Sequence, residues 1–298
     1  MTMLVGDQDL TLSEIYQSVA DLFIEHPQIR EAFDSIDEHV LRARFTGRAK
    51  SLLITGGSGV GKSSLLDWYY KSNFKELITE THSYRNMLSS SIPRPASISF
   101  LVEQLLRDIG DMYYNKGTLD NKLSRLPYYL EQTGVEVILL DEFQHFLNLE
   151  DNRVVKKTAE WFYSFFDKVN IPVILFGIEE AEVILEKFEP LRDMVTDKVV
   201  IKPFGFDTVE EREQFCHLLT EFDKRLPFEK HSSLSDETMA KRMFDASNGN
   251  IATIHYLITE ATLLAAKEDD NSIRLRHLAQ AYEKDGFANL GKGNPFCD

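Results

Sequence analysis

The sequence has few cysteines and no long apolar run. Cys216 and Cys297 are the only cysteines among 298 residues, and neither has a CxxC partner or metal-type spacing. A disulfide framework and a zinc site are therefore not expected. No apolar stretch approaches the roughly 18–20 residues that cross a bilayer, and residues 1–10 lack the pattern of a signal peptide. The sequence predicts a soluble, cytoplasmic protein with no membrane partner.

Basic charge is scarce as well. The 33 Lys and Arg residues stand against 48 Asp and Glu residues, which gives a formal net charge of −15. Such a balance argues against a protein that coats nucleic acid through bulk electrostatics. Any contact with DNA would need basic residues that are clustered, or repeated along an assembly.

Apolar runs alternate with helical patterns over residues 50–202. Short apolar strands that alternate with helices favour a parallel sheet. The expected strands are 51–55, 135–140, 171–177 and 198–201, with a less clear one within 82–89. Only helical patterns follow residue 208. We therefore expect an N-terminal helical segment (1–48), an α/β subdomain (49–204), a small α-helical lid (205–288) and a flexible tail (289–298).

A glycine-rich motif lies between the first strand and the next helical pattern. It fits G-x-x-x-x-G-K-[ST], in which backbone N–H groups surround a phosphate, the lysine bridges the β- and γ-phosphates and the hydroxyl binds Mg²⁺. The non-functional alternative is a flexible glycine loop in which the lysine occurs by chance. The residues predicted to bind ATP are Gly56, Gly57, Ser58, Gly59, Val60, Gly61, Lys62, Ser63 and Ser64.

An acidic pair follows the apolar run that ends at Leu140. Asp141 would lie at the carboxyl edge of the sheet and hold Mg²⁺ together with Ser63, and Glu142 would act as general base toward water. An Asp-Glu pair can also be a helix N-cap. With the glycine-rich motif, the pair predicts an additional-strand (ASCE) P-loop ATPase of the AAA+ plan: a five-stranded parallel sheet sandwiched by helices, followed by the lid.

Residues 140–147, which read LDEFQHFL, resemble the TnsC/TniB family of AAA+ ATPases, which regulate Tn-seven-like transposons. The resemblance covers roughly residues 12–296. Within the family, the sequence is similar in detail to TnsC proteins of CRISPR-associated type I-F elements. The other segments that carry it are Ile174-Leu175-Phe176-Gly177, Lys202-Pro203-Phe204, the sequence LPFEK at 226–230, Ser247-Asn248-Gly249-Asn250 and Asn294-Pro295-Phe296.

The resemblance implies a function that the ATP motifs alone do not. Such proteins form ATP-dependent oligomers, rings or filaments, on double-stranded DNA, and they connect a TniQ/TnsD-like target selector to a TnsB/TnsA-like transposase. The assembled form would be nucleoid-associated in a bacterium. The resemblance places Lys116 and Thr118 at the DNA backbone, and the alternative is a solvated turn between two helices.

The chain departs from the family at its expected arginines. Met194 stands where the family has the arginine that reaches a neighbouring subunit's γ-phosphate, and Arg192 either substitutes for it or pairs locally with Glu189 or Asp193. Ala252 and Thr253 occupy the place of the lid arginine, and Ile178 that of a polar sensor. Because a finger arginine contributes ~10³–10⁵ in rate, these departures predict a slow ATPase.

The sequence is compatible with three functions. The first is an ATP-dependent transposition regulator in which slow hydrolysis disassembles the oligomer. The others are a nucleotide-gated scaffold with negligible hydrolysis and a P-loop signalling or defence ATPase that does not bind DNA. His145 has no Cys or His partner nearby in the sequence, so a structural or nucleotide-sensing role is favoured over a ligand or base.

Overall fold

The computed structural model describes residues 2–5, 8–80, 82–147, 152–284 and 293–297. By their contacts the residues form two compact units. We call them the sheet unit (Pro27–Ser58 and Lys62–Ile201) and the helical unit (Met1–His26, Gly59–Gly61 and Lys202–Asp298). These are units of contact, and the domain boundaries drawn from the sequence stay predictions.

The sheet unit is built on a five-stranded sheet in the order β6-β7-β8-β3-β9. Each neighbouring pair is parallel, with β3 between β8 and β9. The predicted five-stranded parallel sheet is confirmed. Its strands are β3 (Ser51–Gly56), β6 (Met87–Ser91), β7 (Val137–Asp141), β8 (Val173–Gly177) and β9 (Val195–Ile201).

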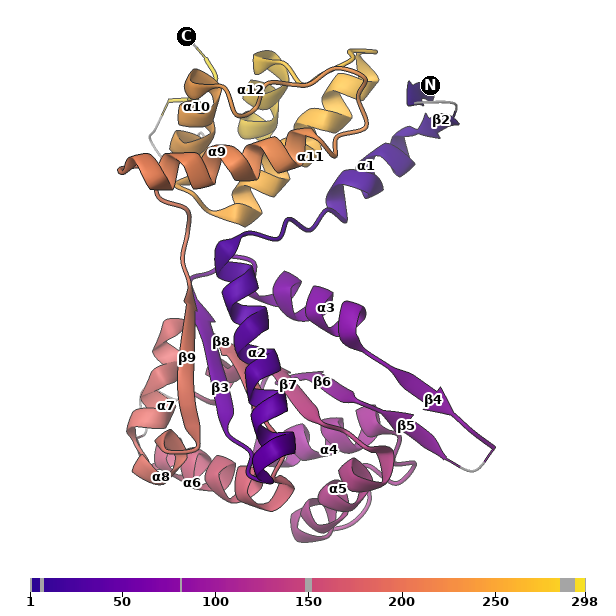
Figure 1. Ribbon diagram of the computed structural model, residues 1–298, viewed down its shortest axis with the longest axis vertical. Helices are drawn as coiled ribbons and strands as arrows, with labels where there is room; N and C mark the ends of the chain where they lie inside the picture. The colour runs from indigo at the N-terminus through magenta and orange to yellow at the C-terminus, as the bar shows by residue number, and fades with distance from the viewer. Residues whose placement is uncertain (1, 6–7, 81, 148–151, 285–292, 298) are drawn as a thin grey trace. The chain divides into compact units, whose positions relative to one another are not determined.

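Helices cover both faces of this sheet (Figure 1). Successive side chains of a strand point to opposite faces, and in β7 Ile138 and Leu140 join the core formed with the helices between β6 and β9. Val137 and Leu139, on the other face, are equally buried. The helices on the first face are α4 (Ile98–Ile109), α5 (Leu119–Thr133), α6 (Asn152–Val169), α7 (Glu182–Glu186) and α8 (Glu189–Arg192); α2 (Pro27–Thr46) and α3 (Lys62–Asn73) contact strands from the second.

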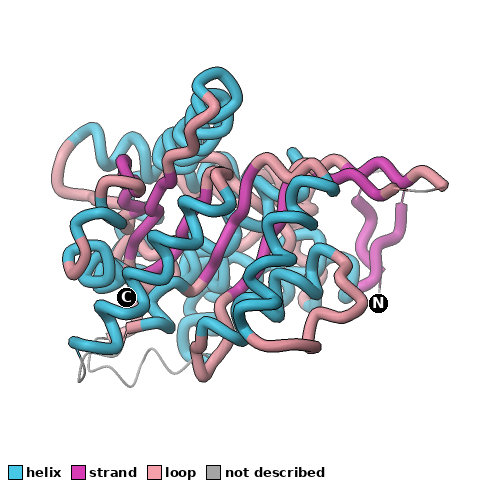
Figure 2. The backbone as a smooth tube through the Cα atoms, turned by 90° about the horizontal axis from the view of Figure 1, so that it is seen from below, coloured by secondary structure: helices cyan, strands magenta, loops and turns pink. Residues whose placement is uncertain are grey.

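The region predicted as one unclear strand, residues 82–89, divides into two elements. Residues Ser83–Arg85 form β5, which pairs antiparallel with β4 (Glu76–Ile78), and β6 then begins at Met87. This hairpin projects beyond the sheet (Figures 1 and 2). The alternating pattern covers both strands because it continues across Asn86, where the chain leaves the hairpin.

The helical patterns after residue 208 correspond to four helices among the described residues. They are α9 (Val209–Asp223), α10 (Glu237–Ser247), α11 (Ile251–Lys267) and α12 (Leu275–Lys284). The helix α1 (Leu12–Ala20) packs against α11, and its Val19 belongs to their common core. A two-stranded ribbon, β1 (Thr2–Val5) with β2 (Gln8–Thr11), precedes α1.

The end of the chain packs against the helical unit. Of the tail predicted over 289–298, residues 293–297 are described, and Phe296 is 2% exposed beside Tyr282. Arg242 donates to the Pro295 carbonyl at 2.8 Å, and Asn294 donates to the Ala279 carbonyl at 3.0 Å. One buried aromatic therefore anchors a segment whose composition alone predicts flexibility. Among the described residues, no helix is long and apolar enough to cross a membrane.

Candidate nucleotide-binding site

The glycine-rich loop connects β3 to α3, as the sequence predicts. Gly59 and Gly61 have positive φ angles of 76° and 95°, which side chains with a Cβ rarely adopt. The 12-residue helix that starts at Lys62 directs its unpaired N–H groups and partial positive charge toward the loop. A loop of this kind before a helix N-terminus binds anions, phosphate in particular.

The Lys62 side chain folds back onto the start of the loop. Its Nζ donates to the carbonyls of Gly56 and Gly57, at 2.8 Å each. Partial burial lowers the pKa of Lys62, and the negative charges of Asp141 and Glu142 oppose that shift. The two motifs predicted from the sequence thus interact electrostatically through this ammonium group.

Ser63 and Asp141 are in direct contact. The Ser63 hydroxyl donates to Asp141 Oδ2 at 2.8 Å, and Oδ1 of the same carboxylate accepts the Glu142 N–H at 2.8 Å. A serine hydroxyl and a carboxylate are hard oxygen donors of the type that Mg²⁺ prefers. The structure therefore brings together the two residues predicted to hold the metal, and their chemistry fits it.

The other predicted phosphate-binding residues lie on the loop and the first helical turn. Gly57 and Ser58 are exposed, and Gly59 is partly exposed. Val60 is 2% exposed, so it contributes its backbone rather than its side chain. Ser64 is exposed on the first turn of α3. Their contacts with phosphate stay predictions.

Glu142 adopts the left-handed conformation, with φ 62° and ψ 37°, between β7 and the short 3₁₀ helix η1 (Phe143–Phe146). Its Oε2 accepts a hydrogen bond from Gln144 Nε2 at 2.5 Å and lies 3.0 Å from His145 Nε2. Sequence reasoning missed Gln144 altogether and assigned His145 no partner. The only available signal was that both follow Glu142 within three residues.

Arg192 lies at the end of α8 and pairs with Glu189 Oε1 at 3.3 Å. Both side chains are exposed, and a pair of this kind contributes little to stability. Of the two roles left open by the sequence, the local pair with Glu189 is the one formed within this chain. Action on a neighbouring subunit stays a prediction.

Lys116 and Thr118 lie in the turn before α5, and both are exposed. The Thr118 hydroxyl caps α5 by accepting from the Asn121 N–H at 3.3 Å, and Arg125 donates to the Lys116 carbonyl at 3.2 Å. Thr118 therefore has a structural role that needs no DNA. The Lys116 ammonium has no ion pair among the described residues and can meet a phosphate.

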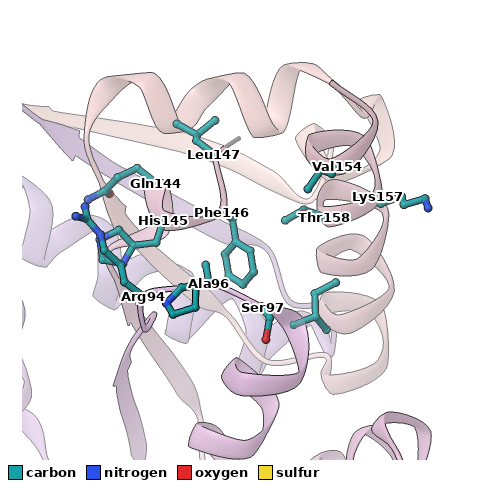
Figure 3. Close-up of a pocket in the computed structure, with 12 residues that line it drawn as sticks. Arg94, Ala96, Ser97, Gln144, His145, Phe146, Leu147, Val154, Lys157 and Thr158 are labelled. Carbon is teal, nitrogen blue, oxygen red and sulfur yellow. The ribbon is translucent and has the colours of Figure 1, made fainter. Parts of the chain in front are cut away.

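A hollow of about 890 Å³ opens beside Gln144 and His145 (Figure 3). Arg94 and Lys157 bring positive charge to it, and the start of α4 and the first turns of α6 complete its wall. Among the described residues, none of Lys62, Ser63 and Asp141 lines it. It is therefore separate from the phosphate loop.

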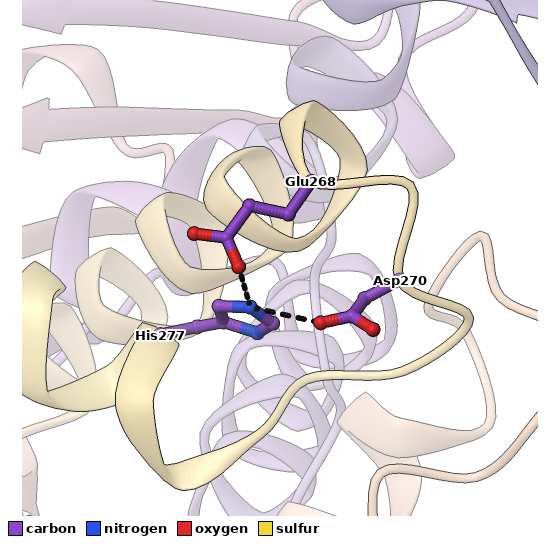
Figure 4. A group of neighbouring side chains, drawn as sticks. All are labelled: Glu268, Asp270 and His277. Atoms are coloured by element: carbon purple, nitrogen blue, oxygen red, sulfur yellow. Dashed lines mark hydrogen bonds and ion pairs between the residues drawn. The ribbon is translucent and has the colours of Figure 1, made fainter.

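A second group of titratable side chains lies in the helical unit. His277 Nε2 lies 3.1 Å from Glu268 Oε2 and 3.3 Å from Asp270 Oδ2 (Figure 4). His277 Nδ1 accepts the Arg274 N–H at 3.1 Å, so in the neutral ring Nε2 carries the proton and cannot bind a metal. Arg276 also pairs with both carboxylates. We interpret the group as an ion-pair network that joins α11 to α12.

Comparison with known proteins gives one family and one fold. A family model described as "Bacterial TniB protein" matches residues 15–192. A search of curated proteins finds no match to this chain.

Several solved structures are similar to this chain over about nine tenths of its length. The ORC2 protein of Aeropyrum pernix, solved as ADPNP-ADP complexes, is 13% identical, with 91% of this chain and 72% of that chain covered and a TM-score of 0.64. The ORC1 protein of the same organism, solved with DNA, is 13% identical over 91% and 68%, with a TM-score of 0.59. A Walker-type ATPase of Pyrococcus abyssi is 14% identical over 91% and 75%, with a TM-score of 0.54. At these identities the similarity shows the fold alone, and that fold is AAA+.

Proposed function

The chain belongs to the TniB family of AAA+ ATPases, which are transposition proteins, and from that premise we propose that it is an ATP-dependent DNA-transposition regulator. In this proposal the protein oligomerises on double-stranded DNA with ATP and Mg²⁺. It then connects a TniQ/TnsD-like target selector to a TnsB/TnsA-like transposase in the bacterial cytoplasm. The contact between Ser63 and Asp141, with Lys62 beside it, is the observation that carries the proposal.

The glycine-rich loop and the residues around it supply the chemistry of ATP binding. The backbone N–H groups of the glycine-rich loop would bind phosphate oxygens, and Lys62 would exchange the carbonyls of Gly56 and Gly57 for β- and γ-phosphate oxygens. Ser63 and Asp141 would hold Mg²⁺, which neutralises negative charge on the phosphates when bound. Glu142 would accept a proton from the attacking water.

Slow hydrolysis suits a switch that holds an assembly together. Met194 stands where the family has its finger arginine, and neither Ala252 nor Thr253 supplies a lid arginine. Without an arginine finger, ATP binding is preserved while turnover falls steeply. ATP would therefore promote assembly, and its hydrolysis would release the subunits.

The charge of the chain favours DNA binding by the assembly over the single subunit. At a net charge of −15 an isolated subunit is repelled by DNA. An oligomer would repeat Lys116 along the phosphate backbone, so that many weak contacts add up. DNA binding should then depend on ATP and fall steeply with salt.

Electron microscopy and sedimentation of the purified chain with linear duplex DNA test the proposal. Assemblies on DNA are expected with ATP and Mg²⁺, and not with ADP or without nucleotide. Lys62→Ala should abolish them, and Glu142→Gln should lengthen their lifetime. Lys116→Ala should weaken DNA binding and reduce its salt dependence, whereas the exposed control Lys187→Ala should not.

The rival functions give different results in the same experiment. For a scaffold with negligible hydrolysis, Glu142→Gln would leave the lifetime of the assembly unchanged. For a signalling or defence ATPase, ATP would be hydrolysed and no DNA-bound assembly would form. Tight DNA binding by a nucleotide-free monomer would contradict the proposed switch.

A further inference from the structure

The turn that follows Glu142 returns two side chains to its carboxylate. Gln144 Nε2 donates to Glu142 Oε2 at 2.5 Å, and His145 Nε2 lies 3.0 Å from the same oxygen. Among the described residues, no hydrogen bond reaches Oε1. One carboxylate oxygen is thus held twice, while the other stays available.

Each of these two side chains has a second polar partner in the backbone. Gln144 Oε1 accepts the Ile178 N–H at 3.2 Å, just after β8, and His145 Nδ1 lies 2.7 Å from the Ile92 carbonyl, just after β6. The strands β6 and β8 flank β7 in the sheet. The ends of three adjacent strands therefore fix the position of one carboxylate.

The partners of His145 determine which nitrogens carry protons. The Ile92 carbonyl only accepts hydrogen bonds, so Nδ1 must donate to it. Nε2 faces a carboxylate and donates to it when the ring carries both protons. His145 is 11% exposed and therefore has few alternative positions. It is a rigid bridge between the Ile92 carbonyl and Glu142.

We propose that His145 is a positioning residue for Glu142, with Gln144 as the second support. The two side chains fix the rotamer of Glu142 through Oε2, and Oε1 is then the oxygen that accepts the proton of the attacking water. This inference rests on the proposed function, in which Glu142 is the general base. A base that is oriented by a third group follows the same logic as other catalytic assemblies.

Two nearly isosteric substitutions separate positioning from a structural role. His145→Gln places an amide NH₂ near the position of Nε2, where it can donate to Glu142. His145→Asn places its NH₂ near the position of Nδ1, where it can donate to the Ile92 carbonyl and cannot reach Glu142. If His145 positions Glu142, His145→Gln should keep most of the turnover. If His145 only anchors the turn through the Ile92 carbonyl, His145→Asn should keep most of the turnover instead.

Single-turnover and steady-state ATP hydrolysis are to be measured on the full chain with these two variants and His145→Ala. A general base contributes roughly 10²–10⁴-fold to a rate. We expect that a base with lost orientation still accepts the proton but that kcat falls about tenfold. His145→Ala and His145→Asn should lower kcat by about this factor, with ATP affinity unchanged. Equal rates for His145→Asn and wild type would overturn the proposal.

A second measurement needs no ATP. In ¹⁵N-histidine-labelled protein, the His145 resonance is assigned by its loss in His145→Gln. Its Nε2 shift should change in Glu142→Ala, which removes the acceptor, and should not change in the control Glu180→Ala. An Nε2 resonance that is the same with and without the Glu142 carboxylate would also overturn the proposal.

The hydrolysis data distinguish this inference from the proposed function. If Glu142→Gln abolishes turnover while His145→Asn does not affect it, the proposed function stands and the positioning role is wrong. If Glu142→Gln leaves turnover at the wild-type rate, Glu142 is not the base, and both its proposed role in hydrolysis and the positioning role of His145 are wrong.

Discussion

The Ser63 hydroxyl and the Asp141 carboxylate lie 78 residues apart in the chain and share a hydrogen bond of 2.8 Å. Ser63 is on the first turn of α3, and Asp141 ends β7. Both elements meet at the carboxyl edge of a parallel sheet, where ligands of open α/β folds bind. This contact joins two separate sequence motifs into one site.

Removing the Ser63 hydroxyl should weaken the response of ATP binding to Mg²⁺. A hydrogen bond to a charged group contributes about 1.5–3 kcal/mol, so Ser63→Ala should reduce the Mg²⁺-dependent gain in ATP affinity by about tenfold or more. Calorimetric titration with and without Mg²⁺ measures this gain. Ser72→Ala, at an exposed position of α3, is the matched control. An unchanged gain in Ser63→Ala would exclude Ser63 as a metal ligand.

Gly177 leaves room for the Gln144 side chain. A Cβ at this position would lie 3.0 Å from Gln144 Oε1 and 3.2 Å from Ala181 Cβ. Gly177→Ala should displace the Gln144 amide and weaken one hydrogen bond, which contributes about 0.5–1.5 kcal/mol, and turnover should fall about twofold to tenfold. Gly293→Ala, where a Cβ would meet open space, should have no effect. Wild-type turnover in Gly177→Ala would show that Gln144 does not support Glu142.

His26 should make folding sensitive to mild acid. It is 3% exposed, and burial lowers its pKa from 6.5 to about 4. Because the unfolded chain binds the proton more tightly, the free energy of unfolding falls as pH decreases from about 6.5 to about 4, by about 3 kcal/mol in total. Urea unfolding across this range measures the loss.

The control for His26 is a second histidine. His26→Leu should remove this part of the pH dependence, whereas His231→Leu, at an exposed position, should leave it as in wild type. If wild type and His26→Leu lose stability in parallel between pH 6.5 and 4, the acid response comes from other groups.

Phe296 should contribute strongly to the stability of the helical unit. Its ring is buried in the core of that unit, 6.2 Å from the Tyr282 ring centroid. Truncation of a buried phenylalanine costs about 3–5 kcal/mol, so Phe296→Ala should lower the free energy of unfolding by about this amount. Cys297→Ala, at the next and exposed residue, serves as control. Equal unfolding midpoints for the two variants would show that the tail is not anchored by Phe296.

The sheet and the phosphate loop could be predicted because each has a strong local signal. Buried parallel strands are continuous apolar runs, as in Ile138 to Leu140, and the glycines mark where β3 gives way to α3. The boundary between β5 and β6 could not be predicted, because an alternating pattern does not show with which strand it pairs.

The fine structure of the site depends on contacts that the sequence does not display. Gln144 donates to Glu142 across a turn in which Glu142 adopts a left-handed conformation, and the sequence does not show that conformation. The polar composition around Phe296 also gave no sign of its burial, which comes from packing against Tyr282 of α12 in the core of the helical unit. The Gln144–Glu142 contact and the burial of Phe296 both depend on tertiary structure rather than on local secondary-structure propensity.

The packing of α1 against α11 sets the order in which the protein can fold during synthesis. During synthesis α1 emerges from the ribosome first, and its partner helix α11 emerges more than 200 residues later. The residues of the sheet unit come between these two helices in the sequence, so this unit can complete its core while α1 still has no partner. The apolar face of α1, formed by Ile15 and Val19, is therefore exposed in the nascent chain until α11 has been synthesised. A premature stop before α11 would leave this face exposed permanently.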